Sequence, residues 1–208
     1  MAATAAPQPL TPAALRARLT RPWRHGEHAA LAGITCTGRA DLSGCDLAGV
    51  DLSGAHFPHG LDARGARFLG ISWFAGARFG AGADFSDAVF MNDARFEDAR
   101  FLGHAGFAAT EFRGIARFDR AGFAAGASLA GCVALGNLSL QGARFDGPVS
   151  LRGAQLMGGL WCEDARLPAD ADLSGTEIHG RLWLRGARRG DRPLRAADFA
   201  IAFGYVWS

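Results

Sequence analysis

Residues 77–101 read ARFGAGADFSDAVFMNDARFEDARF, and their spacing is the strongest structural signal in the chain. A Phe recurs at alternating steps of six and five residues, and an Ala stands two places before each Phe. The same walk runs from Phe68 to Leu184 through 22 positions that are all apolar, and 14 of the 22 residues two places before them are Ala. A period of about 5.5 fits neither a helix at about 3.6 nor a strand at about 2. It indicates a solenoid whose turns present the same residues inward.

The N-terminal part of the repeat has a simpler period of five. Residues 40–54 read ADLSG, CDLAG and VDLSG in succession. These units resemble the pentapeptide-repeat family, whose unit is Ala-Asp/Asn-Leu-x-x, and the Ala-Arg-Phe units from Ala63 onward resemble an Ala-x-Phe-rich subgroup of it. The resemblance implies an all-β fold, a right-handed quadrilateral parallel β-helix. In that fold the central Leu or Phe and the residue two places before it point inward.

Four faces of five, six, five and six residues make a coil of 22, so inward residues should stack on neighbours 22 positions away. We therefore predict stacks of aromatic rings, which add to simple burial. The predicted stacks are Phe68–Phe90–Phe112, Phe74–Phe96–Phe118 and Phe79–Phe101–Phe123–Phe145. A flattened coil of half this length, which would stack Phe79 on Phe90, is the alternative.

Three segments are expected along the chain. Residues 1–28 would hold a disordered start, up to residue 10, and a capping helix from roughly Pro12 to Leu19, because Thr11 suits an N-cap and Pro12 the first helical turn. Residues 29–186 would form the β-helix. Residues 187–208 would be an apolar C-terminal cap or contact tail, because the next inward slots fall on Ala187-Arg188-Arg189, which is unsuited to a core.

Composition limits the classes of protein to which the chain can belong. The formal net charge is only +2, which is low for a generic nucleic-acid binder. All four Cys fall on inward rows and none forms a C-x-x-C pair, so we expect buried free thiols in a reducing compartment. We find no secretory h-region and no apolar run near the roughly 20 residues of a membrane span. A cytoplasmic protein is expected.

No stretch of the sequence carries a recognisable catalytic pattern. The nucleophile-elbow, P-loop and zincin motifs are all missing. The pairs His25/His28 and His56/His59 share a spacing of three, but Gly26 and Pro58 make both segments loop-like, and further ligands are lacking nearby. We therefore predict no catalytic, cofactor or metal site, and we do not expect an enzyme.

Outward positions become candidate partner-binding residues when the chain is folded at 22. One column reads Arg78, Arg100, Gly122, Arg144 and Arg166. It is either a stripe for an acidic partner or a solvated face balanced by acidic neighbours, namely Asp87, Asp98 and Asp146. Trp161 and Trp183 should be outward neighbours, which suits an interface or cover by the C-terminal tail. A third face carries an apolar patch, formed by Val89, Met91, Val133, Leu135 and Met157.

These observations favour a non-enzymatic scaffold, a rigid rod that binds a protein partner or self-associates as a homodimer through its tail. One alternative is suggested by the family resemblance, in which some members mimic DNA and bind DNA gyrase. Those members are strongly acidic, whereas this chain carries +2 and folding it at 22 gives no acidic stripe. Direct nucleic-acid binding by the Arg column is disfavoured because outward aromatic residues and arginines do not interleave beyond Trp73 and Arg95. The identity of the partner is not encoded in these patterns.

Overall fold

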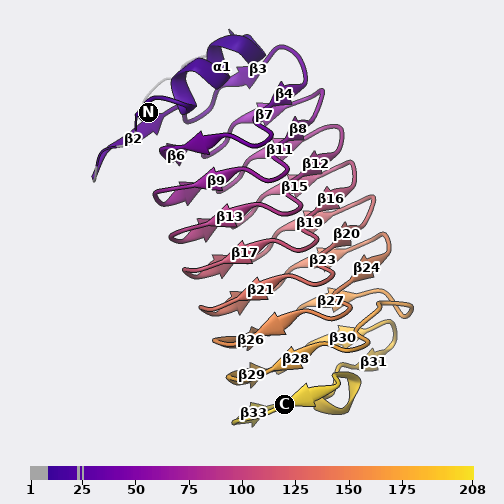
Figure 1. The fold of residues 1–208 in the computed structure, drawn as a ribbon. Helices are drawn as coiled ribbons and strands as arrows, with labels where there is room; N and C mark the ends of the chain where they lie inside the picture. Colours follow the sequence, from indigo (N-terminus) through magenta and orange to yellow (C-terminus); the bar gives the residue numbers. More distant parts are fainter. Residues whose placement is uncertain (1–8, 23, 25) are drawn as a thin grey trace, which may run out of the picture.

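The computed structural model describes residues 9–208 except residues 23 and 25. Over this range the chain winds into a rod of stacked coils with a short helix at its N-terminal end (Figure 1). The strands form four sheets that run along the rod, with ten, six, eight and nine strands. The chain visits the sheets in a fixed order, and we number the four faces of the rod in that order.

Each strand is only two or three residues long, as expected for the sides of a narrow coil. The first face contains β1 (Pro9–Leu10), β3 (Thr35–Cys36), β7 (His56–Phe57), β11 (Arg78–Phe79), β15 (Arg100–Phe101), β19 (Gly122–Phe123), β23 (Arg144–Phe145), β27 (Arg166–Leu167), β30 (Arg188–Arg189) and β31 (Arg192–Pro193). The second face contains β4 (Ala40–Asp41), β8 (Leu61–Asp62), β12 (Ala83–Asp84), β16 (Ala105–Gly106), β20 (Ala127–Ser128) and β24 (Val149–Ser150).

The other two sheets complete the coil. The third face contains β5 (Asp46–Leu47), β9 (Arg67–Phe68), β13 (Val89–Phe90), β17 (Glu111–Phe112), β21 (Val133–Ala134), β25 (Gln155–Leu156), β28 (Glu177–Ile178) and β32 (Ile201–Ala202). The fourth face contains β2 (His28–Ala30), β6 (Gly49–Asp51), β10 (Ser72–Trp73), β14 (Ala94–Arg95), β18 (Ala116–Arg117), β22 (Leu138–Ser139), β26 (Gly159–Trp161), β29 (Arg181–Trp183) and β33 (Val206–Trp207).

The strand register confirms the predicted length of the coil. Phe79 pairs with Phe101, and Phe90 pairs with Phe68 on one side and Phe112 on the other. The described strands pair in parallel, apart from the antiparallel pair β30 and β31. The four-sided β-helix is therefore confirmed, and the flattened alternative is wrong.

The core is a set of aromatic stacks that run along the rod. Rings one coil apart lie face to face, for example Phe79 and Phe101 with centroids 4.8 Å apart, and Phe101 and Phe123 with centroids 4.9 Å apart. The predicted stacks are all present, and Phe85 and Phe107 form a further one. The rings are buried, and the small Ala side chains between them let four rings from four faces share one coil.

Two of the four corners impose a left-handed backbone. The corners that leave the second and fourth faces place their turn residue at φ near +60°, as at Gly65 and Gly142. Glycine adopts this conformation without a steric cost. Five non-glycine residues occupy the same corner position in other coils, namely Asp87, Asp98, Ala109, Arg120 and Asp164. The repeat therefore sets the backbone at these corners even where the local residue disfavours it.

The N-terminal end of the core is covered as the sequence predicts. Helix α1 spans Pro12–Leu19, and the Thr11 hydroxyl accepts a hydrogen bond from the Ala14 amide at 3.2 Å. Leu15 and Leu19 are fully buried against the first coils. The expected disorder up to residue 10 is wrong for residues 9 and 10, which form β1 and pair with β3. Residues 1–8 lie outside the described part.

The C-terminal segment differs from the expectation that the repeat stops after Leu184. Strand ladders continue on three faces: β30 pairs with β27, β32 with β28, and β33 with β29. The antiparallel hairpin of β30 and β31 lengthens this coil, so Trp207 pairs with Trp183 at a separation of 24 rather than 22. Part of the tail does act as a cap, because Leu194 and Phe199 are buried against the core.

Arg189 is a charged residue that continues the inward row of the first face beyond its apolar members. It succeeds Leu167 in the inward register of the first face, and its side chain is about three-quarters buried, at 24% exposure. Its guanidinium donates hydrogen bonds to the carbonyl oxygens of Ala169 (3.1 Å) and Ala171 (2.8 Å). Asp198 lies 3.6 Å from it and supplies the opposite charge. A charge at the end of the core is tolerated because it is paired and hydrogen-bonded.

The stacking model makes a direct prediction about stability. Phe101→Ala should lower the free energy of unfolding by roughly 3–5 kcal/mol, because it leaves a cavity in a rigid stack. Phe101→Asp should prevent folding. Leu102→Ala is the matched control, since Leu102 is 59% exposed and its loss should cost no more than about 0.5 kcal/mol. Urea denaturation measures all three, and equal curves for Phe101→Ala and wild type would contradict the stacked core.

Candidate functional site

The first face brings the predicted arginines into one column. Arg78 pairs in register with Arg100, Gly122 separates Arg100 from Arg144, and Arg144 pairs with Arg166. All four arginines are exposed. We call Arg78, Arg100, Arg144 and Arg166 the arginine column. The register extends it by Arg188, which the sequence analysis did not include.

Most of this column lacks acidic partners. Arg144 Nε lies 3.1 Å from Asp146 Oδ1. Among residues 9–208 other than 23 and 25, no carboxylate lies within 4.0 Å of the guanidinium groups of Arg78, Arg100 or Arg166. Like charges directly opposite each other on neighbouring strands destabilise a sheet. Arg100 Nη1 donates a hydrogen bond to the carbonyl oxygen of Arg120 (2.7 Å), and no ion pair within 4.0 Å offsets the repulsion between Arg78 and Arg100 in the described residues.

The expected neutralisation of this face by Asp98 is not made. Arg120, at the corner next to the column, binds Asp98 with Nε at 2.9 Å and Nη2 at 2.7 Å. This hydrogen bonding holds the pKa of Asp98 below its usual value. Asp146 is engaged by Arg144 as expected, whereas Asp87 forms no ion pair with any cation in the described part of the chain. Direct ion pairing with a neighbouring carboxylate is thus confined to Arg144 among the four arginines of the column, and Asp98 attracts Arg100 only at longer range.

A hollow interrupts the column at Gly122. It has a volume of about 450 Å³ and lies between Arg100 and Arg144. Leu102 and Ala124 form part of its lining, together with buried core residues beneath. Arg120 and Asp146 also line the hollow, so arginines, one carboxylate and apolar groups all border the space at Gly122.

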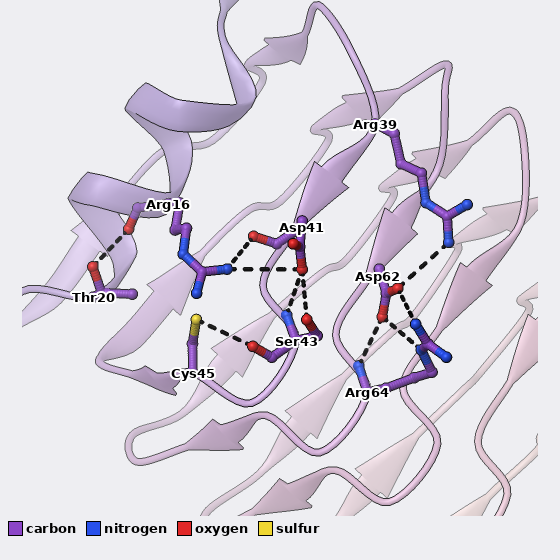
Figure 2. A network of polar contacts seen from close by, with 8 residues as sticks. All are labelled: Arg16, Thr20, Arg39, Asp41, Ser43, Cys45, Asp62 and Arg64. Carbon is purple, nitrogen blue, oxygen red and sulfur yellow. Dashed lines mark hydrogen bonds and ion pairs between the residues drawn. The ribbon is translucent and has the colours of Figure 1, made fainter.

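The second face contains a carboxylate that is paired with arginines of the same chain. Asp62 is 7% exposed, and its carboxylate accepts hydrogen bonds from Arg64 Nε (2.9 Å) and Nη2 (2.7 Å), while Arg39 Nη2 lies 3.5 Å away (Figure 2). The hydrogen bond from Arg64 holds the pKa of Asp62 below its usual value. This nearly buried carboxylate is fully satisfied by its own chain.

Asp62 belongs to a short acidic column with Asp41 and Asp84, which pair with it in register on either side. Asp41 accepts hydrogen bonds from the backbone amide and hydroxyl of Ser43, at 3.0 and 2.7 Å, and lies 3.7 Å from Arg16 of α1 (Figure 2). The expectation that the chain has no acidic stripe is therefore wrong at its N-terminal end. Folding the sequence at a constant period missed this column because Asp62 follows Asp41 one position earlier than the regular coil requires.

The predicted tryptophans lie on the fourth face. Trp161 pairs in register with Trp183, and Trp183 stacks on Trp207 with ring centroids 5.0 Å apart. Trp161 and Trp183 are half-buried rather than fully outward, and with Gln141 and Glu163 they line a hollow of about 200 Å³. The stacking of Trp207 on Trp183 corresponds to cover by the tail, one of the two alternatives, for Trp183 alone.

The apolar patch predicted on the third face is present but discontinuous. Leu135 and Met157 are 50% and 45% exposed, and Val133 is half-buried beside them. Arg113 and Glu111 form an ion pair at 2.8 Å between this group and the coil that holds Val89 and Met91. The charged pair divides the face into two small apolar areas.

The repeat seen in the structure also matches a known protein family. A family model described as pentapeptide repeats (9 copies) matches residues 48–89, 63–110, 85–133 and 109–155. Together these matches cover residues 48–155, more than half of the chain. The chain belongs to the pentapeptide-repeat family. A comparison with curated proteins found no match.

The histidines and cysteines of this pentapeptide-repeat protein were the other candidate sites. His28 packs against Trp73 with ring centroids 5.3 Å apart, and His25 lies outside the described residues. No group of three or more metal-ligating side chains occurs in the part of the chain that the structure describes. Burial raises the pKa of both Cys132 and Cys162 to about 12, so these thiols stay protonated. Within the described residues, no helix is long and apolar enough to cross a membrane.

The pairing of Asp62 makes the stability of this pentapeptide-repeat coil depend on pH. Asp62→Asn should lower the free energy of unfolding at pH 7 by roughly 1–3 kcal/mol, because charge-assisted hydrogen bonds to Arg64 are lost. The pKa of Asp62 is lower in the folded state, so its contribution is present above the ordinary value of 3.8 and is lost as pH falls through the folded value.

Urea denaturation at pH 7 and at a pH well below 3.8 tests this expectation. Wild type and Asp62→Asn should differ at pH 7 and converge at the lower pH. Asp170→Asn is the control, since Asp170 is exposed and makes no ion pair within the described residues. A difference that stays constant with pH would show that Asp62 acts through packing rather than charge.

Proposed function

We propose that this protein is a non-enzymatic interaction scaffold whose arginine column binds an acidic protein partner. The observation that carries the proposal is the pairing of Arg78 with Arg100 in register, with no carboxylate within 4.0 Å of either guanidinium in the described chain. A partner that supplies carboxylates would relieve the repulsion between these cations. On the second face, by contrast, the charged residue Asp62 is neutralised by Arg39 and Arg64 of the same chain.

The rod is suited to present such a column without rearrangement. Parallel ladders on both sides hold the outward residues at fixed intervals, and the core beneath them is filled by stacked rings. A filled interior offers no room for an enclosed active site, which favours binding over catalysis. The four cysteines are buried free thiols, which fits a reducing compartment such as the cytoplasm.

A role as a DNA mimic that acts on a topoisomerase has less support. The acidic column of Asp41, Asp62 and Asp84 is short, and Arg16, Arg39 and Arg64 surround it (Figure 2). Such carboxylates would have to leave their own arginines to imitate phosphates. We therefore rank an acidic protein partner first.

Charge removal tests the proposed function. Replacing Arg78, Arg100, Arg144 and Arg166 by Gln should leave folding intact and weaken binding of fluorescent poly-L-glutamate by at least about fourfold, since four exposed charge pairs contribute roughly 0.2–1 kcal/mol each. Binding should also weaken as salt rises, because exposed charges are screened beyond about 10 Å at 0.1 M.

A second variant with the same net charge is the control. It replaces four exposed arginines on other faces by Gln, namely Arg67, Arg113, Arg152 and Arg181. Fluorescence anisotropy should show near wild-type binding for this variant. Equal losses in the two variants would mean that only net charge matters, and the proposed surface would be rejected.

Self-association is a second candidate, supported by exposed aromatic residues in the tail. Phe203 and Tyr205 are 61% and 76% exposed, and they precede Trp207 on the last described coil. We expect Phe203→Ser with Tyr205→Ser to convert a dimer into a monomer in sedimentation experiments without changing the far-ultraviolet circular dichroism. If wild type is already monomeric at micromolar concentration, the tail does not mediate a dimer.

A further inference from the structure

The hollow at Gly122 has a chemical character that the rest of the arginine column lacks. Arg100 and Arg144 stand at its two edges, and Leu102, which is 59% exposed, lies on its side with Ala124. A Cβ placed on Gly122 would meet the side chain of Arg100 at 3.3 Å, so the flexible Arg100 side chain lies over Gly122 and a larger residue there would displace it. The surface therefore combines cations along a line with one apolar depression near its middle.

The spacing of the column favours an α-helix as the ligand. Strands in one sheet lie about 4.8 Å apart, so the five steps from Arg78 to Arg188 span about 24 Å. A helix that carries one acidic residue per turn repeats every 5.4 Å or so and spans about 27 Å in five turns. An extended strand repeats its same-face side chains every 6.7 Å or so and would span about 33 Å. The column and the helix differ less in length than the column and the extended strand do. Long, flexible arginine side chains can therefore compensate more easily for the difference from a helix.

The columns beside the arginines argue for protein rather than nucleic acid. The outward residues two places after the column include Leu102, Ala124 and Asp146, and the one cation two places before it is Arg120, which Asp98 binds. Nucleic-acid binding sites are much more positively charged than protein interfaces, because phosphate contacts supply most of the affinity. A single row of cations with a carboxylate and a leucine beside it suits a narrow acidic ligand better than a duplex.

From these observations we infer that the column binds an acidic, amphipathic α-helix of a protein partner, with one apolar side chain of that helix seated in the Gly122 hollow. This inference rests on the proposed function and specifies its ligand. The carboxylates of the helix would lie against the arginines on both sides of Gly122. Leu102 and Ala124 would contact the apolar side chain and exclude water from it.

The test uses Gly122→Arg, which fills the hollow and completes the row of cations. Gly122 does not have a positive φ, so the variant should fold, and circular dichroism checks this. The probe is an alanine-based helical peptide of about 18 residues with one stripe of Glu and a central Leu. Gly122→Arg should weaken its binding about tenfold, although the protein has gained a positive charge.

Two controls separate the hollow from general electrostatics. Ser128→Arg adds the same charge on the second face and should leave peptide binding unchanged. A peptide whose central Leu is replaced by Ala should bind wild type about tenfold more weakly and should not lose affinity for Gly122→Arg. Tighter binding of the Leu peptide to Gly122→Arg would overturn the inference.

Further binding measurements distinguish failure of the helix inference from failure of the proposed function. If a peptide with the same Glu residues spread around the helix binds as well as the striped one, the helix inference is wrong, while the proposed function stands as long as poly-L-glutamate binding depends on the column. If a short DNA duplex binds more tightly than the striped peptide and gains from Gly122→Arg, the ligand is nucleic acid and the inference is wrong. If the quadruple Arg→Gln variant still binds poly-L-glutamate, the proposed function itself fails.

Discussion

Face-to-face stacking of buried Phe rings sets the geometry on which the rest of this solenoid depends. Phe101 and Phe123, one coil apart, have centroids 4.9 Å apart and ring planes within 2° of parallel. A slip of one residue in any strand would turn its Phe outward and its charged neighbour inward. The register of the coil is therefore held by the core, and the ladders and corners follow it. Even Ala109 takes a left-handed turn conformation because the coil requires it there.

The same register decides what the outside of the rod can do. Residues one coil apart face each other at strand spacing, so each outward column places side chains from successive coils next to one another. On the second face Asp62 is neutralised by Arg64 and Arg39. On the first face Arg78 and Arg100 stand in register with no carboxylate beside them in the described chain. One fold thus contains a charged column that is paired internally and another that is mostly without ion pairs in the described chain, and the difference lies in the neighbouring residues rather than in the backbone.

Periodicity was sufficient to predict the Phe stacks, the four sides and the arginine column, because each depends on spacing along the chain. The capping signals of Thr11 and Pro12 were sufficient to predict helix α1. Features that break the period could not be predicted in the same way. The pairing of Trp183 with Trp207 was missed because a hairpin lengthens that coil. The capping role of Arg189 depends on carbonyl groups of a neighbouring loop, which no inward pattern reveals. The Gly122 hollow was missed because its shape depends on Leu102 and on the arginines at its edges.

Pulsed electron–electron double resonance between spin labels on the third face tests the central claim most directly. Labels at Arg67 and Gln155 are separated by four coils in the observed register, so their backbones should lie about 19 Å apart at about 4.8 Å per coil. Moving the second label to Glu177 adds one coil and should lengthen the distance to about 24 Å. A distance of about 38 Å for the first pair, as expected if each coil held half as many residues, would contradict the stacked four-sided coil and every surface column derived from it.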